Sequence, residues 1–356
     1  MRQSIAGSVT LSDIAERAQV STSTVSRALS HPDRVARATH ERILRIVEEM
    51  NYQPNVLARG LRRRQSMIVG LVIADILNDF HATIAKGVQD AAYQRGYTVM
   101  FGNTDEDPMR EERFLQALNQ HRFAGLIIVP TERSRELLAR YARTPVVEVD
   151  RSSGREDAHV ILADNVASSR AAVAHLAELG HTRIAAVTGS RTVTTGAERL
   201  QGYLDGMREA GLAVDLGWIA PAARHDEASG FEAMQRLLEL PAGRRPTAVF
   251  AFNNQVTAGV LRSLKSAAIR VPQQMSLVGF DDSRWAQLMA PSLTVVAQPA
   301  RDMGYLAAER LFSLIANPDL PGTVTRLATR LVLRESTAAV PDGAGASAAS
   351  VENTAR

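Results

Sequence analysis

Residues 10–29 read TLSDIAERAQVSTSTVSRAL and contain two short segments of helical periodicity, separated by a turn around Gln19. Ile14 and the neighbouring alanines share one face of the first segment, and Val25 and Leu29 share one face of the second. Glycine is commoner than glutamine in such a turn, so we expect modest strain or a slightly different turn there. The pattern predicts a helix-turn-helix.

The second segment is rich in hydroxyl side chains, which compete for backbone hydrogen bonds and are mediocre in helix interiors. A recognition helix would explain them by position. Ser21 is placed to cap the helix, and Thr22 and Ser23 lie on its outward N-terminal side. Ser26 and Arg27 share that side, where hydroxyls reach phosphates or base edges and Arg pairs with guanine. The alternative is a surface helix of an all-helical module that binds another protein.

Charge is distributed unevenly along the 356 residues. Residues 1–66 contain 11 arginines, no lysine and 6 acidic residues, a net charge of +5, whereas the remainder has a net charge of −2. This asymmetry favours DNA as the partner of the N-terminal end. The chain has no cysteine, which excludes disulfides and thiolate metal sites, and it lacks a signal-peptide core or a membrane-length apolar run. We expect a soluble, cytoplasmic protein.

Helical spacing resumes over residues 38–50 and is broken by Pro54. Residues 1–53 are therefore predicted to form a three-helix DNA-binding bundle. Residues 54–66 contain a short helical stretch and the arginine triplet 62–64, and they are predicted to form a linker.

The rhythm changes at Met67, where apolar runs of strand length begin to alternate with helical segments. Near-continuous hydrophobic strands indicate sheets that are covered on both faces, so two parallel, doubly wound α/β lobes are predicted. The runs are IVGLVIA (68–74), YTVMFG (97–102), GLIIVP (125–130), PVVEVD (145–150), RIAAVTG (183–189), TAVFAFN (247–253) and SLVGFDD (276–282).

The C-terminal part contains the strand LTVVAQP (293–299), an amphipathic helix and a final strand pair near residues 325–334. We expect the strand and the helix to complete the first lobe. The predicted boundaries are about 67–162 plus 293–324 for lobe one and about 163–292 plus 325–337 for lobe two. The tail, 338–356, is rich in Ala, Gly and Ser and is predicted to be disordered.

Polar side chains end several of the predicted strands, and ligands in open α/β sheets bind beyond those carboxyl ends. Asp150, Asn253 and Asp281 each end a strand, while Asn78 and Phe80 follow the first one. Carboxylates and amides around an aromatic ring suit a polyhydroxylated ligand. The alternatives are that Asp281 caps a helix and that Asn253 is a turn residue.

Enzyme functions find little support in the sequence. No dinucleotide fingerprint or phosphate loop follows a strand, and the eight histidines show no metal-binding spacing. We therefore expect no catalytic residue, metal or cofactor. A sugar-binding or sugar-processing protein without DNA function is the alternative, but it leaves the basic N-terminal segment unexplained.

Motifs in a fixed order along residues 9 to about 337 resemble the LacI/GalR family of transcriptional regulators. They are TLSDIAERAQVSTSTVSRALS, EEMNYQPNVLARGL, IVGLVIADILNDF, GHTRIAAVTG, ERLQGY, FNNQVTAGVL, VPQQMSLVGFDD, LTVVAQP and LVLRES. The resemblance implies an N-terminal all-α helix-turn-helix bundle with a hinge helix, followed by a two-lobed, periplasmic-binding-protein-like effector domain. It also implies a homodimeric repressor that binds a near-palindromic double-stranded operator and responds to a small effector, a sugar or sugar derivative.

The resemblance also assigns a role to the linker. In that family the segment matching 55–61 folds into a hinge helix on operator DNA, where paired leucines wedge into the minor groove. Leu61 matches the wedge, Ala58 lies beside it, and Arg62 is placed to reach a phosphate or groove edge. A plain flexible linker with a basic end is the alternative. The predicted DNA-binding residues are Thr10, Ser21, Thr22, Ser23, Ser26, Arg27, Asn55, Ala58, Leu61 and Arg62.

Family positions that commonly bind the effector match four residues here, and an aromatic pocket position matches Phe80. The departures are Asn254, where the family usually has Asp, and His81, where an aromatic residue is frequent, so the ligand is expected to differ from common hexoses. The predicted effector-binding residues are Asn78, Phe80, Asp150, Arg199, Asn253 and Asp281.

Overall fold

The computed structural model describes residues 9–30, 32–50, 52, 66–141 and 144–340. The chain divides into two compact units, residues 1–66 and 67–356, which are described separately. The fold predicted from the sequence is confirmed: a helix-turn-helix unit is followed by two α/β lobes. No helix in the described part of the chain combines the length and the apolar character needed to cross a membrane.

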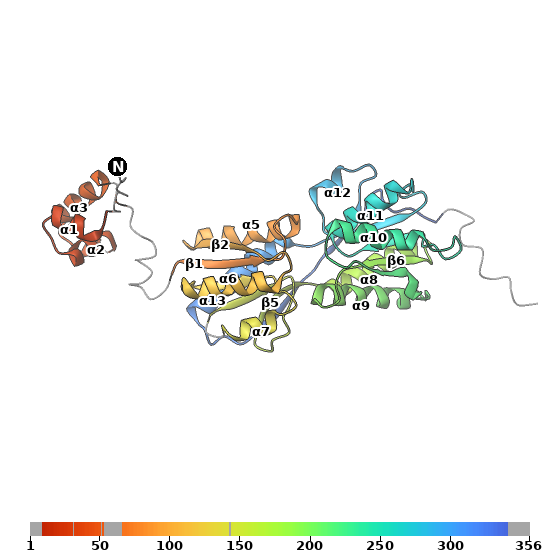
Figure 1. Cartoon of the computed structure of the whole chain (residues 1–356), viewed down its shortest axis with the longest axis horizontal. Coiled ribbons are helices and arrows are strands. Elements are labelled where there is room, and N and C mark those ends of the chain that lie inside the picture. The colour runs from red at the N-terminus through yellow and green to blue at the C-terminus, as the bar shows by residue number, and fades with distance from the viewer. Residues whose placement is uncertain (1–8, 31, 51, 53–65, 142–143, 341–356) are drawn as a thin grey trace, which may run out of the picture. The chain divides into compact units, whose positions relative to one another are not determined.

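The N-terminal unit contains three α-helices and a single 3₁₀ turn in its described residues (Figure 1). They are α1 (Leu11–Arg17), α2 (Thr22–Ser30), η1 (Pro32–Arg34) and α3 (Arg37–Glu49). Ile14, Val25 and Ile43, one from each α-helix, are fully buried in a common core. The helix-turn-helix is thus held together by the apolar faces that the sequence pattern predicts.

The turn between α1 and α2 departs from ordinary backbone geometry at Gln19, whose φ is 51°. The backbone N–H of Gln19 donates to the carbonyl of Glu16 at 3.1 Å, and that of Val20 donates to Ala15 at 3.0 Å, closing the turn. The expected strain therefore takes the form of a left-handed residue with a Cβ atom.

Replacing Gln19 with Gly is expected to stabilise the N-terminal unit by about 0.5–1 kcal/mol. A left-handed conformation costs a residue with a Cβ about 1–2 kcal/mol, and the greater chain entropy of unfolded Gly offsets part of that gain. Hydrogen exchange over residues 10–30 of the full chain would measure the change. Gln19→Ala keeps the Cβ and serves as the control. Equal protection from hydrogen exchange in the two variants would show that the Cβ of residue 19 does not strain the turn.

The first lobe of the second unit is built on a six-stranded sheet of order β11-β5-β4-β3-β1-β2, with all pairings parallel. Helices α5 and α13 pack on one face, and α6 and α7 on the other (Figure 1). The elements are β1 (Ile68–Ile73), α5 (Asp79–Gln94), β2 (Thr98–Asn103), α6 (Pro108–Gln120), β3 (Gly125–Ile128), α7 (Ser134–Ala139), β4 (Val146–Val149), β5 (His159–Ala163), α13 (Ala300–Ala316) and β11 (Thr323–Leu327).

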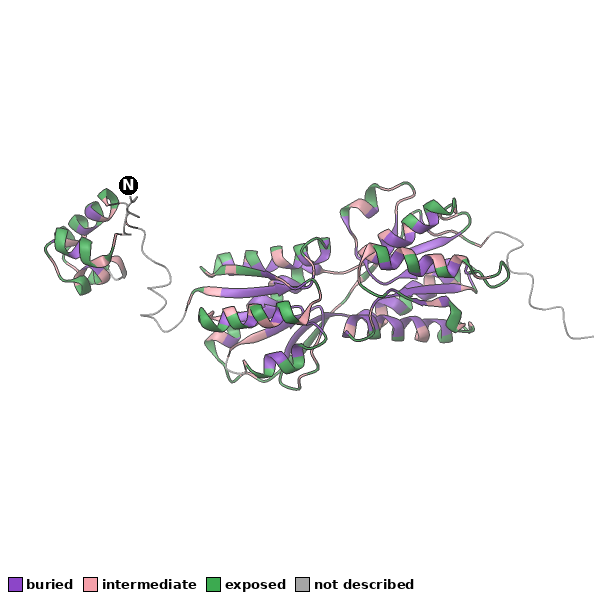
Figure 2. Ribbon diagram, in the orientation of Figure 1, coloured by how far each residue is buried: buried purple, intermediate pink, exposed green. Residues whose placement is uncertain are grey.

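The second lobe is built on a sheet of order β12-β10-β9-β8-β6-β7, in which only β12 runs antiparallel to its neighbour. Helices α8 and α9 cover one face and α10, α11 and α12 the other, so the central strands β6, β8, β9 and β10 are buried (Figure 2). The elements are α8 (Asn165–Glu178), β6 (Ile184–Thr188), α9 (Thr194–Glu209), η2 (Leu216–Trp218), β7 (Ile219–Pro221), α10 (Glu227–Leu238), β8 (Ala248–Ala251), α11 (Asn254–Ser266), β9 (Ser276–Phe280), α12 (Arg284–Leu288), β10 (Thr294–Ala297) and β12 (Arg330–Val332).

The placement of the strand in residues 293–299 was predicted wrongly. This strand, β10, lies between β9 and β12 in the second lobe, not in the first. The final strands do not pair with each other either, because β11 joins β5 in the first sheet while β12 joins β10 in the second. An apolar run indicates that a strand is buried, but not in which of two similar sheets. As a result the chain crosses between the lobes three times, after β5, after β10 and after β11.

The start of the predicted disordered tail is also different, because residues 338–340 run along the second lobe. The Ala338 carbonyl lies 3.1 Å from His181 Nε2, and the N–H of Val340 donates to the Leu179 carbonyl at 3.1 Å. Backbone hydrogen bonds therefore hold residues whose composition resembles a linker. Residues 341–356 lie outside the described residues.

Helices α5 and α13 cross at very short distance through two glycines, Gly87 and Gly304. A Cβ at Gly87 would lie 2.1 Å from the Arg301 carbonyl oxygen, and one at Gly304 would lie 2.1 Å from the Ile84 carbonyl oxygen. Only residues without side chains permit this approach. The crossing fixes α5, which begins at the carboxyl end of β1.

Candidate functional site

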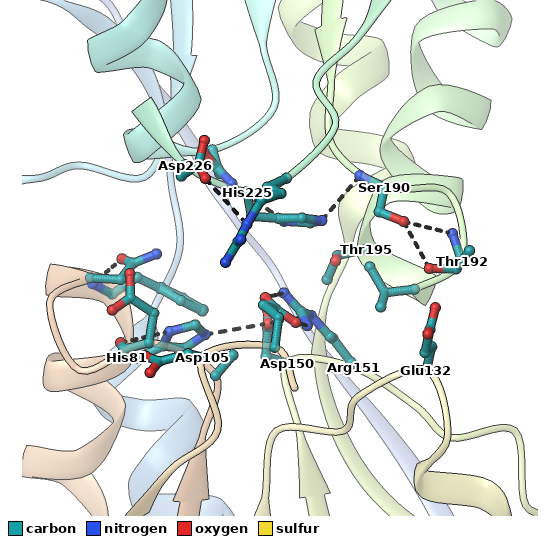
Figure 3. Close-up of a pocket in the computed structure, with 18 of the residues that line it drawn as sticks. His81, Asp105, Glu132, Asp150, Arg151, Ser190, Thr192, Thr195, His225 and Asp226 are labelled. Carbon is teal, nitrogen blue, oxygen red and sulfur yellow. Dashed lines mark hydrogen bonds and ion pairs between the residues drawn. The ribbon is translucent and has the colours of Figure 1, made fainter. Parts of the chain in front are cut away.

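A cavity of about 690 Å³ lies between the two lobes, at the carboxyl ends of both sheets (Figure 3). The structure brings all six predicted effector-binding residues to it: Asn78, Phe80, Asp150, Arg199, Asn253 and Asp281. They arrive on separate elements of both lobes, as the strand-end rule predicts. Among the described residues that line this cavity, only Ala74, Phe80, Val193 and Ala223 are apolar. Hydrogen bonding therefore dominates what the cavity can recognise.

Arg199 is a buried and tightly held cation of the cavity. It comes from α9, only 5% of its surface is exposed, and its guanidinium lies 3.6 Å from the centre of the Phe280 ring. Nε donates to Asn165 Oδ1 at 2.8 Å, and Nη1 donates to the Phe252 carbonyl. Burial lowers the pKa of Arg199, while the charge of Asp281 opposes that effect. The packing and these hydrogen bonds hold the cation in one orientation.

Asp150 and Asp281 occupy equivalent positions in the two lobes, each directly after a central strand. Both are buried, and both have left-handed backbones, with φ of 69° and 73°. Such strain in non-glycine residues concentrates at functional sites. Burial raises the pKa of Asp281, whereas for Asp150 the nearby His81 side chain and the charge of Arg151 outweigh burial and lower the pKa. The two carboxyls are therefore electrostatically different despite their similar positions.

The hydrogen bonds of Asp281 and Asn253 bear on the alternative roles, a helix cap for Asp281 and a turn residue for Asn253. Asp281 does not cap α12, whose N-cap is Ser283; it accepts from Gln298 Nε2 at 2.6 Å and from the Asn254 N–H at 3.3 Å. Asn253 does cap α11, because its Oδ1 accepts from the Val256 N–H at 2.7 Å. Because Oδ1 is used in this bond, the Nδ2 group of Asn253 is the end of the amide that remains for the cavity.

Sequence reasoning missed the ion pair between Glu106 and Arg151. Two hydrogen bonds of 2.6 and 2.8 Å join the guanidinium of Arg151, which is 4% exposed, to the Glu106 carboxylate. Burial opposes the ionisation of Glu106, but the Arg151 cation overcomes it and lowers the pKa to about 2. Arg151 directly follows Asp150, so the strand-end rule could have found it. Glu106 lies in the turn after β2, where no local signal marks it.

Two further residues that the predictions did not include are His225 and Gln298. His225 comes from the loop after β7, a short strand that the sequence pattern did not reveal, and its Nε2 accepts from the Ser190 N–H at 3.1 Å (Figure 3). Burial, reinforced by the Arg151 charge, lowers the pKa of His225 to about 4. On the facing lobe, His81 places Nε2 4.0 Å from Asp150 Oδ2. Imidazoles therefore approach the cavity from both lobes.

Hydrogen bonds also join the two lobes beside the cavity. Asn254 Nδ2 donates to Asn78 Oδ1 at 2.8 Å, and the Ser152 N–H donates to Thr194 Oγ1 at 3.0 Å. Asn78 Oδ1 also accepts from the Phe80 N–H at 2.9 Å, so the same oxygen caps α5. A change in the angle between the lobes would therefore act on the first turn of α5.

The outward face of α2 carries the predicted DNA-contacting side chains. Ser21 Oγ accepts from the Thr24 N–H at 3.2 Å and thereby caps the helix, while Thr22, Ser23 and Arg27 are exposed and Ser26 is half-buried. Thr10 caps α1 in a reciprocal pair with Asp13, whose Oδ2 accepts from the Thr10 N–H at 2.7 Å. The predicted residues Asn55, Ala58, Leu61 and Arg62 lie outside the described residues.

Known protein families match both the N-terminal unit and the second unit of the chain. Residues 10–55 match the family model of bacterial regulatory proteins, lacI family, and residues 173–337 match that of a periplasmic binding protein-like domain. The ribose operon repressor of Escherichia coli (strain K12) is 35% identical over 330 residues, which cover 92% of this chain and 99% of that protein.

Solved structures give the same picture. The lac repressor dimer bound to operator and the anti-inducer ONPF has a TM-score of 0.82 and 27% identity, covering 94% of this chain and 100% of that one. A complex of the transcriptional regulator CelR with cellobiose has a TM-score of 0.70 and 30% identity, covering 92% and 99%.

Proposed function

The chain belongs to the LacI family of bacterial regulatory proteins, and from that premise we propose that it is a cytoplasmic repressor whose affinity for its operator is controlled by a sugar or sugar derivative bound between its lobes. The observation that carries the proposal is that one chain combines the exposed polar face of α2 with a polar cavity at the carboxyl ends of two sheets. The first surface suits DNA, and the second suits a polyhydroxylated ligand.

A gel shift with near-palindromic DNA at two salt concentrations, with and without a sugar panel, tests this function. Specific binding that weakens steeply with salt is expected, because phosphate contacts release counterions. At least one sugar is expected to change the affinity. Binding that is indifferent to DNA sequence, or to every sugar, would count against the proposal.

The chemistry of the cavity favours a neutral polyol over an anion or a nucleobase. Carboxylates outnumber guanidinium groups among its lining residues, so a phosphorylated or acidic sugar would meet repulsion. Phe80 is the one phenyl or indole ring on the lining among the described residues, which leaves little surface for stacking a base. D-ribose is the first probe to try, because the similar Escherichia coli protein is a ribose operon repressor. A thermal-shift screen of pentoses, hexoses, sugar acids and nucleosides would rank the classes.

Effector binding is proposed to reach DNA through α5 in a homodimer. The first turn of α5 is tied to the second lobe through Asn78, and further along the helix Tyr93 is 84% exposed; Met100 of the edge strand β2 is exposed as well. Such an apolar surface fits a two-fold dimer contact. In this mechanism closure of the cavity shifts the dimer contact and the spacing of the paired hinge segments at Asn55, Ala58, Leu61 and Arg62. A coupling free energy of about 1–3 kcal/mol would be typical.

Replacing Arg27 with Ala is expected to lower operator affinity by about 10- to 100-fold and to relax base preference at one operator position, because an arginine at a base edge contributes about 1–3 kcal/mol. A gel shift against operator variants measures both effects. Arg17→Ala is the matched control, since this exposed arginine on α1 pairs with Glu49 at 3.4 Å. A uniform loss across all DNA sequences would instead make Arg27 a phosphate contact.

A further inference from the structure

His225 has a neighbourhood that fixes both the position and the protonation of its ring. The ring lies against Gly189, where an added Cβ would come within 2.8 Å of its Cε1 atom. The Ser190 N–H points at Nε2 from 3.1 Å. A backbone N–H can only donate, so Nε2 is the unprotonated nitrogen of the ring.

The proton of the neutral ring must then lie on Nδ1. Because burial and the Arg151 charge lower the pKa of His225 to about 4, the ring is neutral at pH 7. Nδ1 lies 3.4 Å from Nδ2 of Asn253. The orientation of that amide is set independently, because Asn253 Oδ1 accepts from the Val256 N–H at the start of α11.

Two N–H groups therefore face each other and cannot bond to each other. Both residues line the cavity, where an oxygen atom placed against them would accept from both. The arrangement needs histidine in one tautomer; phenylalanine would fill a similar volume but offer no donor. Accepting oxygens are what hydroxyl groups and sugar rings supply.

We propose that His225 is a specificity-determining residue of the effector cavity, and that its Nδ1–H and the Asn253 Nδ2–H together bind one oxygen of a polyhydroxylated effector. This inference rests on the proposed function, since it assigns a recognition role within that cavity. It deepens the function by naming a donor pair that selects a ligand with an acceptor at one position over an analogue without it.

The tautomer can be tested without any ligand. Long-range nitrogen-proton NMR correlation of the full chain labelled at histidine, at pH 7, is expected to show His225 protonated at Nδ1 and unprotonated at Nε2. His225→Phe identifies the signal by its loss. A ring protonated at Nε2, or charged at this pH, would overturn the proposal.

The second test measures binding of D-ribose and of analogues that each lack one oxygen: 2-deoxy-D-ribose, 5-deoxy-D-ribose, 1,4-anhydro-D-ribitol and a carbocyclic ribose. The wild type is expected to bind one analogue about 10- to 100-fold more weakly than ribose, because a buried polar pair left unsatisfied is strongly penalised. His225→Phe is expected to bind ribose about as weakly as the wild type binds that analogue. This variant should then bind ribose and the analogue with equal affinity. Retention of every discrimination by this variant would overturn the proposal.

Two further variants separate recognition from folding. Gly189→Ala keeps every polar group but displaces the ring, and it is expected to reproduce the loss of discrimination. His175→Phe makes the same exchange outside the cavity, at a histidine whose Nε2 lies 3.0 Å from Thr337 Oγ1, and it is expected to leave ribose affinity unchanged. If neither ribose nor any other sugar of the thermal-shift panel binds the wild type, the proposed effector class fails, and the NMR result alone decides whether His225 presents its donor.

Discussion

Replacing Arg199 with Met is expected to weaken D-ribose binding at least about 100-fold and to leave the operator complex insensitive to the sugar. The guanidinium is the buried cation whose charge acts on both Asp150 and Asp281, so its removal leaves two buried carboxyls with less compensation. In a binding site, truncating one partner of a buried, hydrogen-bonded charge pair typically costs about 2–5 kcal/mol of binding free energy, and each 1.4 kcal/mol is about tenfold in affinity. Calorimetric titration with ribose and a gel shift with and without ribose measure the two effects.

A matched control for Arg199 is Arg224→Met, which removes the same cation from the rim of the same cavity. Arg224 is largely exposed and pairs with Asp226 at 3.4 Å, so its loss is expected to change affinity by less than about threefold. Arg199→Lys keeps the positive charge but loses the planar set of guanidinium N–H donors, and its ribose affinity is expected to lie between those of Arg224→Met and Arg199→Met. If the operator complex of Arg199→Met still responded fully to ribose, a role of Arg199 in binding the effector would be contradicted.

Replacing Gly87 with Ala is expected to lower the free energy of unfolding of the second unit, residues 67–356, by about 3 kcal/mol or more. The new Cβ would meet the Arg301 carbonyl oxygen at 2.1 Å and the Tyr305 nitrogen at 2.9 Å. Both are backbone atoms, so no side chain can rotate away and α5 must separate from α13. A fall in midpoint temperature on the order of 6 °C is expected from calorimetry of the full chain.

The control for Gly87 is Gly243→Ala, because an added Cβ at Gly243 meets nothing within 4 Å and its φ is not in the left-handed region. Its midpoint temperature should equal that of the wild type. An unchanged midpoint for Gly87→Ala would show that the two helices can move apart freely, and that their crossing does not fix α5.

Local patterns in the sequence predicted the architecture because each reflects a local cause. The capping position of Ser21, the unusual turn at Gln19 and the strand-ending residues Asp150 and Asp281 all follow from periodicity and from the geometry of parallel sheets. The same rule brought Asn253 to the cavity. These are features whose residues lie within a few positions of the element that defines them.

What could not be predicted depends on contacts between distant segments. Glu106 and His225 lie in turns and join the cavity through contacts with residues distant in the sequence, Glu106 with Arg151 and His225 with Ser190, and neither carries a sequence signal. The sheet to which β10 belongs depends on its pairing with β9 and β12, and periodicity records burial but not partners. The orientation of the His225 ring likewise depends on Gly189 and Ser190, far away in the sequence.

The three crossings between the lobes have a consequence for protein engineering. Neither lobe is one continuous piece, since α13 and β11 return to the first lobe after β10, and β12 then returns to the second. A chimaera that takes one lobe from a relative therefore needs three matched junctions, and a single fusion point at any of these crossings would leave at least one sheet with strands from both parents. Exchange of the whole effector unit at the boundary near Met67 needs only one junction. Recombination between relatives should therefore exchange residues 67–356 as one piece. New ligand specificity within this unit should arise by substitutions at the cavity.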